Sequence, residues 1–225
     1  MKTHSLVALA VVLASAIYGT SDSKNSEVVP KFSHPKAITN PYLPLANLKQ
    51  DILEGTEKGK PLRVERTLKP GSKTFSINGQ DVEALIVEDR EFINGEVEEV
   101  TLDYFAQDDD GTVYYLGEDV DNYKDGKVVA HEGAWLYGVN TKELGVIMPS
   151  HPRVGQKFRP EDVPGITRED DVVVSTSEKV SVPAGKFNNC IKVKESLSEG
   201  ETEYKWFAPG VGAVKEEDLL LKSHT

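Results

Sequence analysis

The sequence predicts an all-β fold, an antiparallel meander that curls into a barrel or half-barrel. The first observation is a set of Asn-Gly and Asp-Gly pairs at 78–79, 94–95 and 125–126. Such pairs favour two-residue hairpin turns, because both central residues need a positive φ. The second observation is alternation of apolar and polar residues between the turns, and the third is the lack of a long amphipathic helical pattern. Tight turns between neighbouring strands make their pairing antiparallel.

Further turn signals divide the chain in order. Turns are predicted at 57–60, 69–71, 78–79, 94–95, 108–111 and 125–126. Regular strands resume after residue 171 with DVVVSTSEKVSV, the run 187–193, ETEYKWFA and VGAVKEE. This spacing predicts about ten to twelve strands in a single β domain over 46–225.

Alternation gives several strands one apolar face. Val100, Leu102 and Tyr104 share one face of their strand, whereas Asp103 and Phe105 share the other. A sheet with one apolar face needs a lid, a second sheet or its own curvature to cover that face. No helical pattern supplies a lid, so the sequence favours curling, which also removes exposed edges. A two-sheet β-sandwich is the alternative architecture.

One segment, 137–171, breaks the strand pattern. It contains eight glycines and prolines and no long apolar period. It therefore predicts an extended crossover loop, with at most a short helical turn near 159–163. Loops of this length often lie across a functional opening.

Residues 1–20 have the pattern of a secretory signal peptide. Lys2 precedes a short apolar run over 6–14, and Ala14-Ser15-Ala16 fits a small-residue cleavage site. The run is too short to span a bilayer. The sequence thus predicts a periplasmic or secreted protein that is not membrane-spanning.

Residues 21–45 predict a proline-rich N-terminal strap that is partly disordered. Four prolines, at 30, 35, 41 and 44, exclude a regular helix or a central strand. Ile38, Tyr42, Leu43 and Leu45 supply enough apolar surface for the strap to lie extended over the domain. The strap is expected either to pack as a simple covering or to plug a ligand cavity.

Charge and cysteine content narrow the functional classes. The formal net charge is −11, and loss of Lys2 with the leader makes the remaining balance 25 − 37 = −12. Such a surface repels phosphate backbones, so no nucleic-acid partner is expected. Cys190 is the single cysteine, which excludes an internal disulfide.

Two stretches carry a resemblance. The runs LDYFAQDDDGTVYYLGEDVDNYKDG, EGAW and GVIMPSHPRVG, followed by VPAGKFNNC and YKWFAPGVGAVKE, resemble an uncharacterised family of exported bacterial proteins over roughly 40–215. The VPAG-x-F pattern with its later Y-x-W-x-AP-G-V-G-x-V also looks like TapB-type proteins, which are similar to the LolA-like lipoprotein carriers. This resemblance implies a strongly curved antiparallel sheet with an apolar concavity, and carriers of that superfamily shelter an acyl chain there.

The aromatic residues provide the candidate ligand-binding positions. Tyr104, Tyr114, Trp135 and Trp206 lie on predicted strands. In a β protein such residues mostly form cross-strand core pairs. If the curved sheet is not filled by its own side chains, they are the natural wall of an apolar pocket. We therefore expect them to line a site for an apolar small molecule or lipid.

Metal and catalytic signals are weak by comparison. Asp108 and Asp110 resemble the middle of a calcium loop, but Gly117 stands where a closing Glu is required. His131 and His151 belong to no metal-binding motif. Catalytic residues and cofactors are therefore not expected.

Three functional classes remain open. The first is a non-enzymatic exported protein that binds an apolar ligand or lipid in its cavity. The second is a structural or partner-binding envelope protein with a filled core. A metal-dependent hydrolase is the third, and it requires His131 or His151 to lie beside a carboxylate in a cleft.

The leader supplies a direct prediction. Expressed with its own N-terminus, the protein should lose about 16 to 21 residues and be recovered in the periplasm or medium, because signal peptidase removes such leaders. Intact-mass measurement of the exported fraction checks the cleavage. An uncut chain in the cytoplasm would contradict it.

Overall fold

The computed structural model describes residues 29–197 and 200–225, so the predicted signal peptide lies outside the described residues. Within those ranges the chain forms one short 3-10 helix, η1, and a sheet of fourteen strands. The elements are η1 (Leu45–Asn47), β1 (Gln50–Glu57), β2 (Lys60–Ile77), β3 (Gln80–Ile93), β4 (Glu96–Gln107), β5 (Val113–Lys124), β6 (Lys127–Ala130), β7 (Trp135–Leu136), β8 (Gly145–Met148), β9 (Lys157–Val163), β10 (Thr167–Val182), β11 (Gly185–Leu197), β12 (Thr202–Ala208), β13 (Gly212–Glu216) and β14 (Leu219–His224). No helix in these ranges has the length and apolar character needed to cross a membrane.

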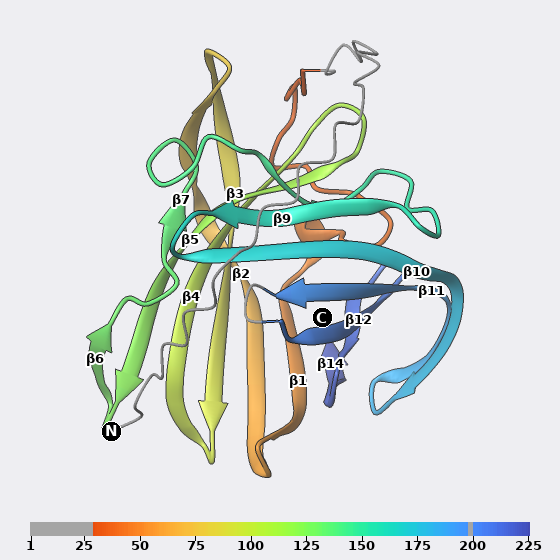
Figure 1. Ribbon diagram of the computed structural model, residues 1–225. Helices are drawn as coiled ribbons and strands as arrows, with labels where there is room; N and C mark the ends of the chain where they lie inside the picture. The colour runs from red at the N-terminus through yellow and green to blue at the C-terminus, as the bar shows by residue number, and fades with distance from the viewer. Residues whose placement is uncertain (1–28, 198–199) are drawn as a thin grey trace, which may run out of the picture.

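The predicted all-β meander is confirmed. The sheet order is β6-β5-β4-β3-β2-β1-β14-β13-β12-β11-β10-β9, and β7 and β8 both pair with β5. All the pairings are antiparallel. The strands belong to one hydrogen-bonded sheet, so the two-sheet sandwich is wrong. The sheet is curled but not closed, because its hydrogen-bonded path starts at β6 and ends at β9. In Figure 1, β9 and β10 run across the long strands β2 to β4.

The hairpin turns form as their sequences dictate. Asn78 and Gly79 have φ values of 51° and 80°, and the other Asn-Gly and Asp-Gly pairs are similar. These left-handed conformations match the twist of the flanking strands. One predicted turn is wrong: at Gly71 the strand β2 continues, and the shift in its pairing with β3 between Lys69 and Lys73 marks a bulge. The extra residues are absorbed by the bulge instead of reversing the chain.

The segment 137–171 is more regular than its prolines and glycines suggest. It contains β8, β9 and the start of β10, and the predicted helical turn near 159–163 lies in strand β9. Pro160 is compatible with that strand because β9 is at the end of the sheet, where one backbone edge needs no donor. Short strands such as β7 and β8 contain too few residues to show the alternation of apolar and polar side chains by which longer strands are recognised. These two strands raise the number of strands above the predicted ten to twelve.

The strap packs against the sheet over its described part. Ile38, Leu43 and Leu45 are buried in a core cluster with Val87 and Phe207. The side-chain amide of Asn40 donates to the carbonyl oxygens of Gly111 (2.9 Å) and Pro149 (3.1 Å). These two bonds satisfy a buried polar group and hold the strap across the ends of β4, β5 and β8.

The two ends of the curled sheet approach each other at Gly145. This residue in β8 lies between the backbone of Tyr115 in β5 and that of Pro160 in β9, and a methyl group at its Cα would overlap the Pro160 carbonyl. The nearest atoms are backbone atoms of Pro160 and Tyr115, so no flexible side chain could move to make room for a methyl group. The absence of a side chain at Gly145 therefore allows the sheet to curl around its interior.

Replacing Gly145 by Ala should destabilise the protein by about 1–3 kcal/mol, the usual cost of overpacking a filled site. Urea denaturation followed by tryptophan fluorescence measures this loss. Glu143→Ala is the matched control, since Glu143 is exposed in the same segment. Equal stability of the two variants would show that β8 does not hold the ends of the sheet together.

Candidate functional site

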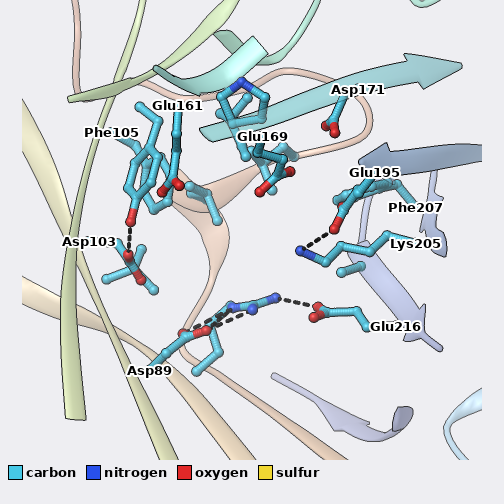
Figure 2. Close-up of a pocket in the computed structure, with 18 residues that line it drawn as sticks. Asp89, Asp103, Phe105, Glu161, Glu169, Asp171, Glu195, Lys205, Phe207 and Glu216 are labelled. Carbon is cyan, nitrogen blue, oxygen red and sulfur yellow. Dashed lines mark hydrogen bonds and ion pairs between the residues drawn. The ribbon is translucent and has the colours of Figure 1, made fainter. Parts of the chain in front are cut away.

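A cavity of about 220 Å3 lies inside the curled sheet (Figure 2). Strands β2 to β5 form one side of its wall, and β8 to β13 form the other. Leu43 and Leu45 of the strap segment cover part of it. The strap, the N-terminal strands and the C-terminal strands thus meet at this cavity, which makes it the natural place for a ligand.

The wall of the cavity divides into an apolar part and a strongly charged part. The apolar part consists of Leu43, Leu45, Val87, Phe105, Tyr115, Ile147, Pro160, Phe207 and Ala213. Seven carboxyl groups and two basic groups form the charged part: Asp89, Asp103, Glu161, Glu169, Asp171, Glu195 and Glu216, with Arg66 and Lys205. The acids outnumber the bases by 7 − 2 = 5.

Strand periodicity explains why charges face the interior. Val173 and Val193 are opposite each other in β10 and β11 and are fully buried. Two residues further along each strand, on the same face, stand Asp171 and Glu195, which are also opposite each other. Their exposed fractions are only 4% and 3%. One inward face therefore changes along its length from apolar to acidic.

Arg66 is paired with two of the acids. Its guanidinium lies 2.7 Å from Asp89 of β3 and 3.1 Å from Glu216 of β13. Burial alone would raise the pKa of Glu216, but the charges of Arg66 and Lys205 hold that pKa below its usual value. This network is a part of the wall in which acids and base are paired.

Lys205 neutralises a third acid. Its ammonium lies 3.1 Å from Glu195 Oε2, and in the sheet it stands opposite both Val193 of β11 and Glu216 of β13. The pKa of Lys205 lies well above its usual value: burial opposes the charged form, but the charges of Glu195 and Glu216 outweigh it. Lys205 is thus a fixed positive charge at the edge of the acidic region.

Glu169, Asp171 and Glu195 form a tight carboxyl cluster. One oxygen from each lies within 4.8 Å of the others. Asp171 Oδ1 is buried and has no hydrogen-bond partner among the described residues. Burial first, and then the charges of Glu169 and Glu195, raise the pKa of Asp171, and burial likewise raises that of Glu195. Figure 2 shows the three side chains gathered at one side of the cavity, close to Lys205.

A second acidic group lies on the side of β4, β5 and β9. The Tyr115 hydroxyl donates to Asp103 at 2.6 Å, and Trp135 Nε1 donates to Glu161 at 3.3 Å. Burial and the neighbouring negative charges raise the pKa of Asp103, and they raise that of Glu118 to about 9. Asp103 and Glu118 therefore favour the neutral, protonated form at pH 7.

The four predicted ligand-binding aromatics do not line this cavity. Tyr104 is buried in another cluster, with its hydroxyl 2.5 Å from Asp119, and Tyr114 packs edge-on against Phe32. Trp206 lies on the face opposite Lys205, where the ammonium groups of two lysines stand over its ring. Trp135 is buried beside Tyr115, next to the cavity but behind its wall.

The residues that do line it are the chain neighbours of three predicted positions. Phe105, Tyr115 and Phe207 face the cavity, each one residue after a predicted aromatic. A shift by one residue in a strand moves a side chain to the other face. Tyr104, Tyr114 and Trp206 therefore lie on the same strands as these cavity-lining residues but on the opposite face. No sequence motif marks the acids that face the cavity. The sequence feature that could have identified Asp171 and Glu195 is their position on the same strand face as the buried Val173 and Val193.

The weak metal and catalytic candidates lie elsewhere. Asp108 Oδ1 accepts hydrogen bonds from the backbone N–H of Asp110 (3.1 Å) and Thr112 (3.0 Å), so its carboxylate organises the turn. Asp110 accepts a hydrogen bond from Ser150. His131 lies 3.0 Å from Asp121 on exposed surface. His151 contacts Ser150, also on exposed surface.

Comparisons of the chain with family models, curated proteins and solved structures gave no match. The resemblance to exported LolA-like proteins therefore stays a prediction. The fold and the cavity define the chain as an all-β protein with an acid-lined interior.

The buried carboxyls predict an unusual dependence of stability on pH. A raised pKa in the folded state means that the folded protein binds the proton more tightly than the unfolded chain does. This stabilisation is full below the unfolded pKa near 4.5 and is lost as the pH rises toward about 7 for Glu91 and about 9 for Glu118. The melting temperature should therefore fall between pH 5 and pH 9, by about 2–4 °C for each kcal/mol lost. Differential scanning calorimetry measures it.

Glu118→Gln is the matched variant, because it keeps the shape of the side chain and removes its titration. It should show a smaller decrease in melting temperature over the same pH interval. Surface carboxylates such as Asp170, whose pKa is lowered by its arginine partners despite some burial, titrate below this interval. A wild-type protein that becomes more stable toward pH 9 would contradict the assignment of neutral buried carboxyls.

Proposed function

We propose that this protein is a non-enzymatic binding protein that holds a small, positively charged ligand in the acid-lined cavity. The observation that carries the proposal is the excess of carboxyls over basic groups in the wall, together with Asp171 Oδ1, which has no partner within 29–197 and 200–225. The predicted signal peptide supports a role outside the cytoplasm.

The energetics favour a cationic ligand. A buried carboxylate without a partner is costly, and in the absence of a cation the group lowers that cost by binding a proton. A bound cation would take the place of the proton. Its attraction to the neighbouring carboxylates would offset the repulsion between them. Arg66 and Lys205 are already paired with Asp89, Glu216 and Glu195, so neither base can neutralise the other acids, and the wall keeps an excess of acidic groups for a ligand.

The predicted lipid ligand is less well matched to this cavity. A volume of about 220 Å3 is below the range of about 300–1,000 Å3 typical of sites for larger apolar molecules. The head group of a fatty acid would also meet carboxylates of the same sign. The apolar part of the wall, with Leu43, Phe105 and Phe207, would instead accommodate a short apolar portion of an organic cation.

A panel of ligands tests the proposal. Thermal shift and calorimetric titration at pH 7.5 should show saturable binding of at least one cation among short alkylammonium ions, diamines and divalent metal salts. Oleate and a neutral alcohol of similar size should produce no saturable binding, because they bring no positive charge to the acids. Ionic strength is kept constant to remove general screening effects.

The location of binding is tested with Ala213→Leu, which adds side-chain volume to the wall of the cavity. It should weaken binding of the cation, whereas Glu98→Gln on exposed surface should not. Folding of both is checked by circular dichroism. Binding of oleate without any cation would favour the lipid-carrier hypothesis, and binding of neither would favour a structural or partner-binding protein; each result would overturn the proposal.

A further inference from the structure

The carboxyl cluster of Glu169, Asp171 and Glu195 has the geometry of a ligand site. The three groups come from two neighbouring strands, with Asp171 directly opposite Glu195 and Glu169 two residues before Asp171 on the same face. One oxygen of each lies within 4.8 Å of the others. Oxygens at that separation can reach a common central ion, because a Ca²⁺–oxygen distance is about 2.3–2.6 Å.

A second observation separates this cluster from an ordinary group of surface acids. Asp171 is 4% exposed, and its Oδ1 lies in the cavity wall without any hydrogen-bond donor among the described residues. Buried carboxylate oxygens in folded proteins normally have partners. A residue that lines a cavity and has a carboxylate oxygen without a partner is the arrangement expected of a metal ligand.

The charges around the cluster match a divalent ion. The three carboxylates carry −3 when ionised, and Lys205, which is 3.1 Å from Glu195, contributes +1. The local sum of −2 would be balanced by one M²⁺. Arg66 with Asp89 and Glu216 adds +1 − 2 = −1 when ionised, so one M²⁺ does not exceed the negative charge around it.

We propose that Glu169, Asp171 and Glu195 bind one hard divalent metal ion, Ca²⁺ or Mg²⁺, inside the curled sheet. Carboxylate oxygens are the ligands these ions prefer, and the cluster offers no imidazole or thiolate that would select a softer metal. The cavity of about 220 Å3 has room for the water ligands that complete the coordination. This inference rests on the proposed function and names the ligand class.

Calorimetric titration of the full-length mature protein with CaCl₂, MgCl₂ and MnCl₂ tests the site, after metal removal with a chelator and at constant ionic strength. Wild-type protein should bind one equivalent of at least one of these ions, and elemental analysis should find that stoichiometry after dialysis. Asp171→Asn and Glu169→Gln should each weaken binding at least about tenfold, since loss of a group that supports a metal commonly costs 10–100-fold.

These variants are suited to the test because each removes a charge from a like-charge cluster and keeps the side-chain shape. In the absence of metal they should be at least as stable as wild type, so lost binding would not reflect lost folding. Asp110→Asn is the matched control: it removes a carboxylate from the exposed acidic turn and should leave metal binding unchanged.

Each remaining outcome has one interpretation. If alkylammonium ions bind and no metal does, the proposed function stands and the metal site is wrong. If a metal binds equally to wild type and Asp171→Asn, the site assignment is wrong. If no cation of either kind binds, both proposals fail, and bound protons and Lys205 are what offset the repulsion within the cluster.

Discussion

Burial of acids inside a curled sheet is the constraint on which the rest of the structure depends. Curling gives every strand an inward face, and carboxyls occupy part of that face on β3, β4, β9, β10, β11 and β13. Only Arg66 and Lys205 oppose them in the cavity wall. Ionised carboxyls cannot be packed together in a medium of low dielectric constant. The interior must therefore combine ion pairs, neutral carboxyls and space for a ligand.

The ion pairs also connect distant parts of the chain. Arg66 on β2 joins Asp89 on the next strand to Glu216 on β13, which is 150 residues later. Because β1 and β14 separate β2 from β13 in the sheet, the Arg66–Glu216 contact spans the concave interior. It stabilises the curvature that Gly145 permits at the other end of the sheet. Removing one partner would leave a buried charge unpaired, which costs more than the pair itself contributes.

The architecture could be predicted from sequence far better than the site. Turn pairs such as Asn78-Gly79 specify hairpins through local φ preferences, so they act without tertiary context. The face that meets the cavity is decided by tertiary packing. Tyr104 appeared to mark the inner face of β4 because it alternates with Leu102, yet that face is buried as well, in a cluster that includes Phe32 of the N-terminal segment and Leu136 of β7. With both faces buried, Asp103 and Phe105 could be assigned to the interior only after the fold was known.

Some acids of the cavity are paired with a base, and Asp171 Oδ1 has no hydrogen-bond partner among the described residues. From this difference we infer that the acidic cavity serves a purpose other than stability. The cluster around Leu53, Val64 and Leu221 is apolar, and it shows that this sheet also buries ordinary core residues. Replacing buried charges by such residues is often neutral or stabilising. Local rules of folding are broken most often at functional sites. Asp171 and Glu195 break one of them, since like charges directly opposite each other destabilise a sheet. A bound cation turns that repulsion into a shared attraction, and it accounts for the cavity, its charge and the unpartnered oxygen together.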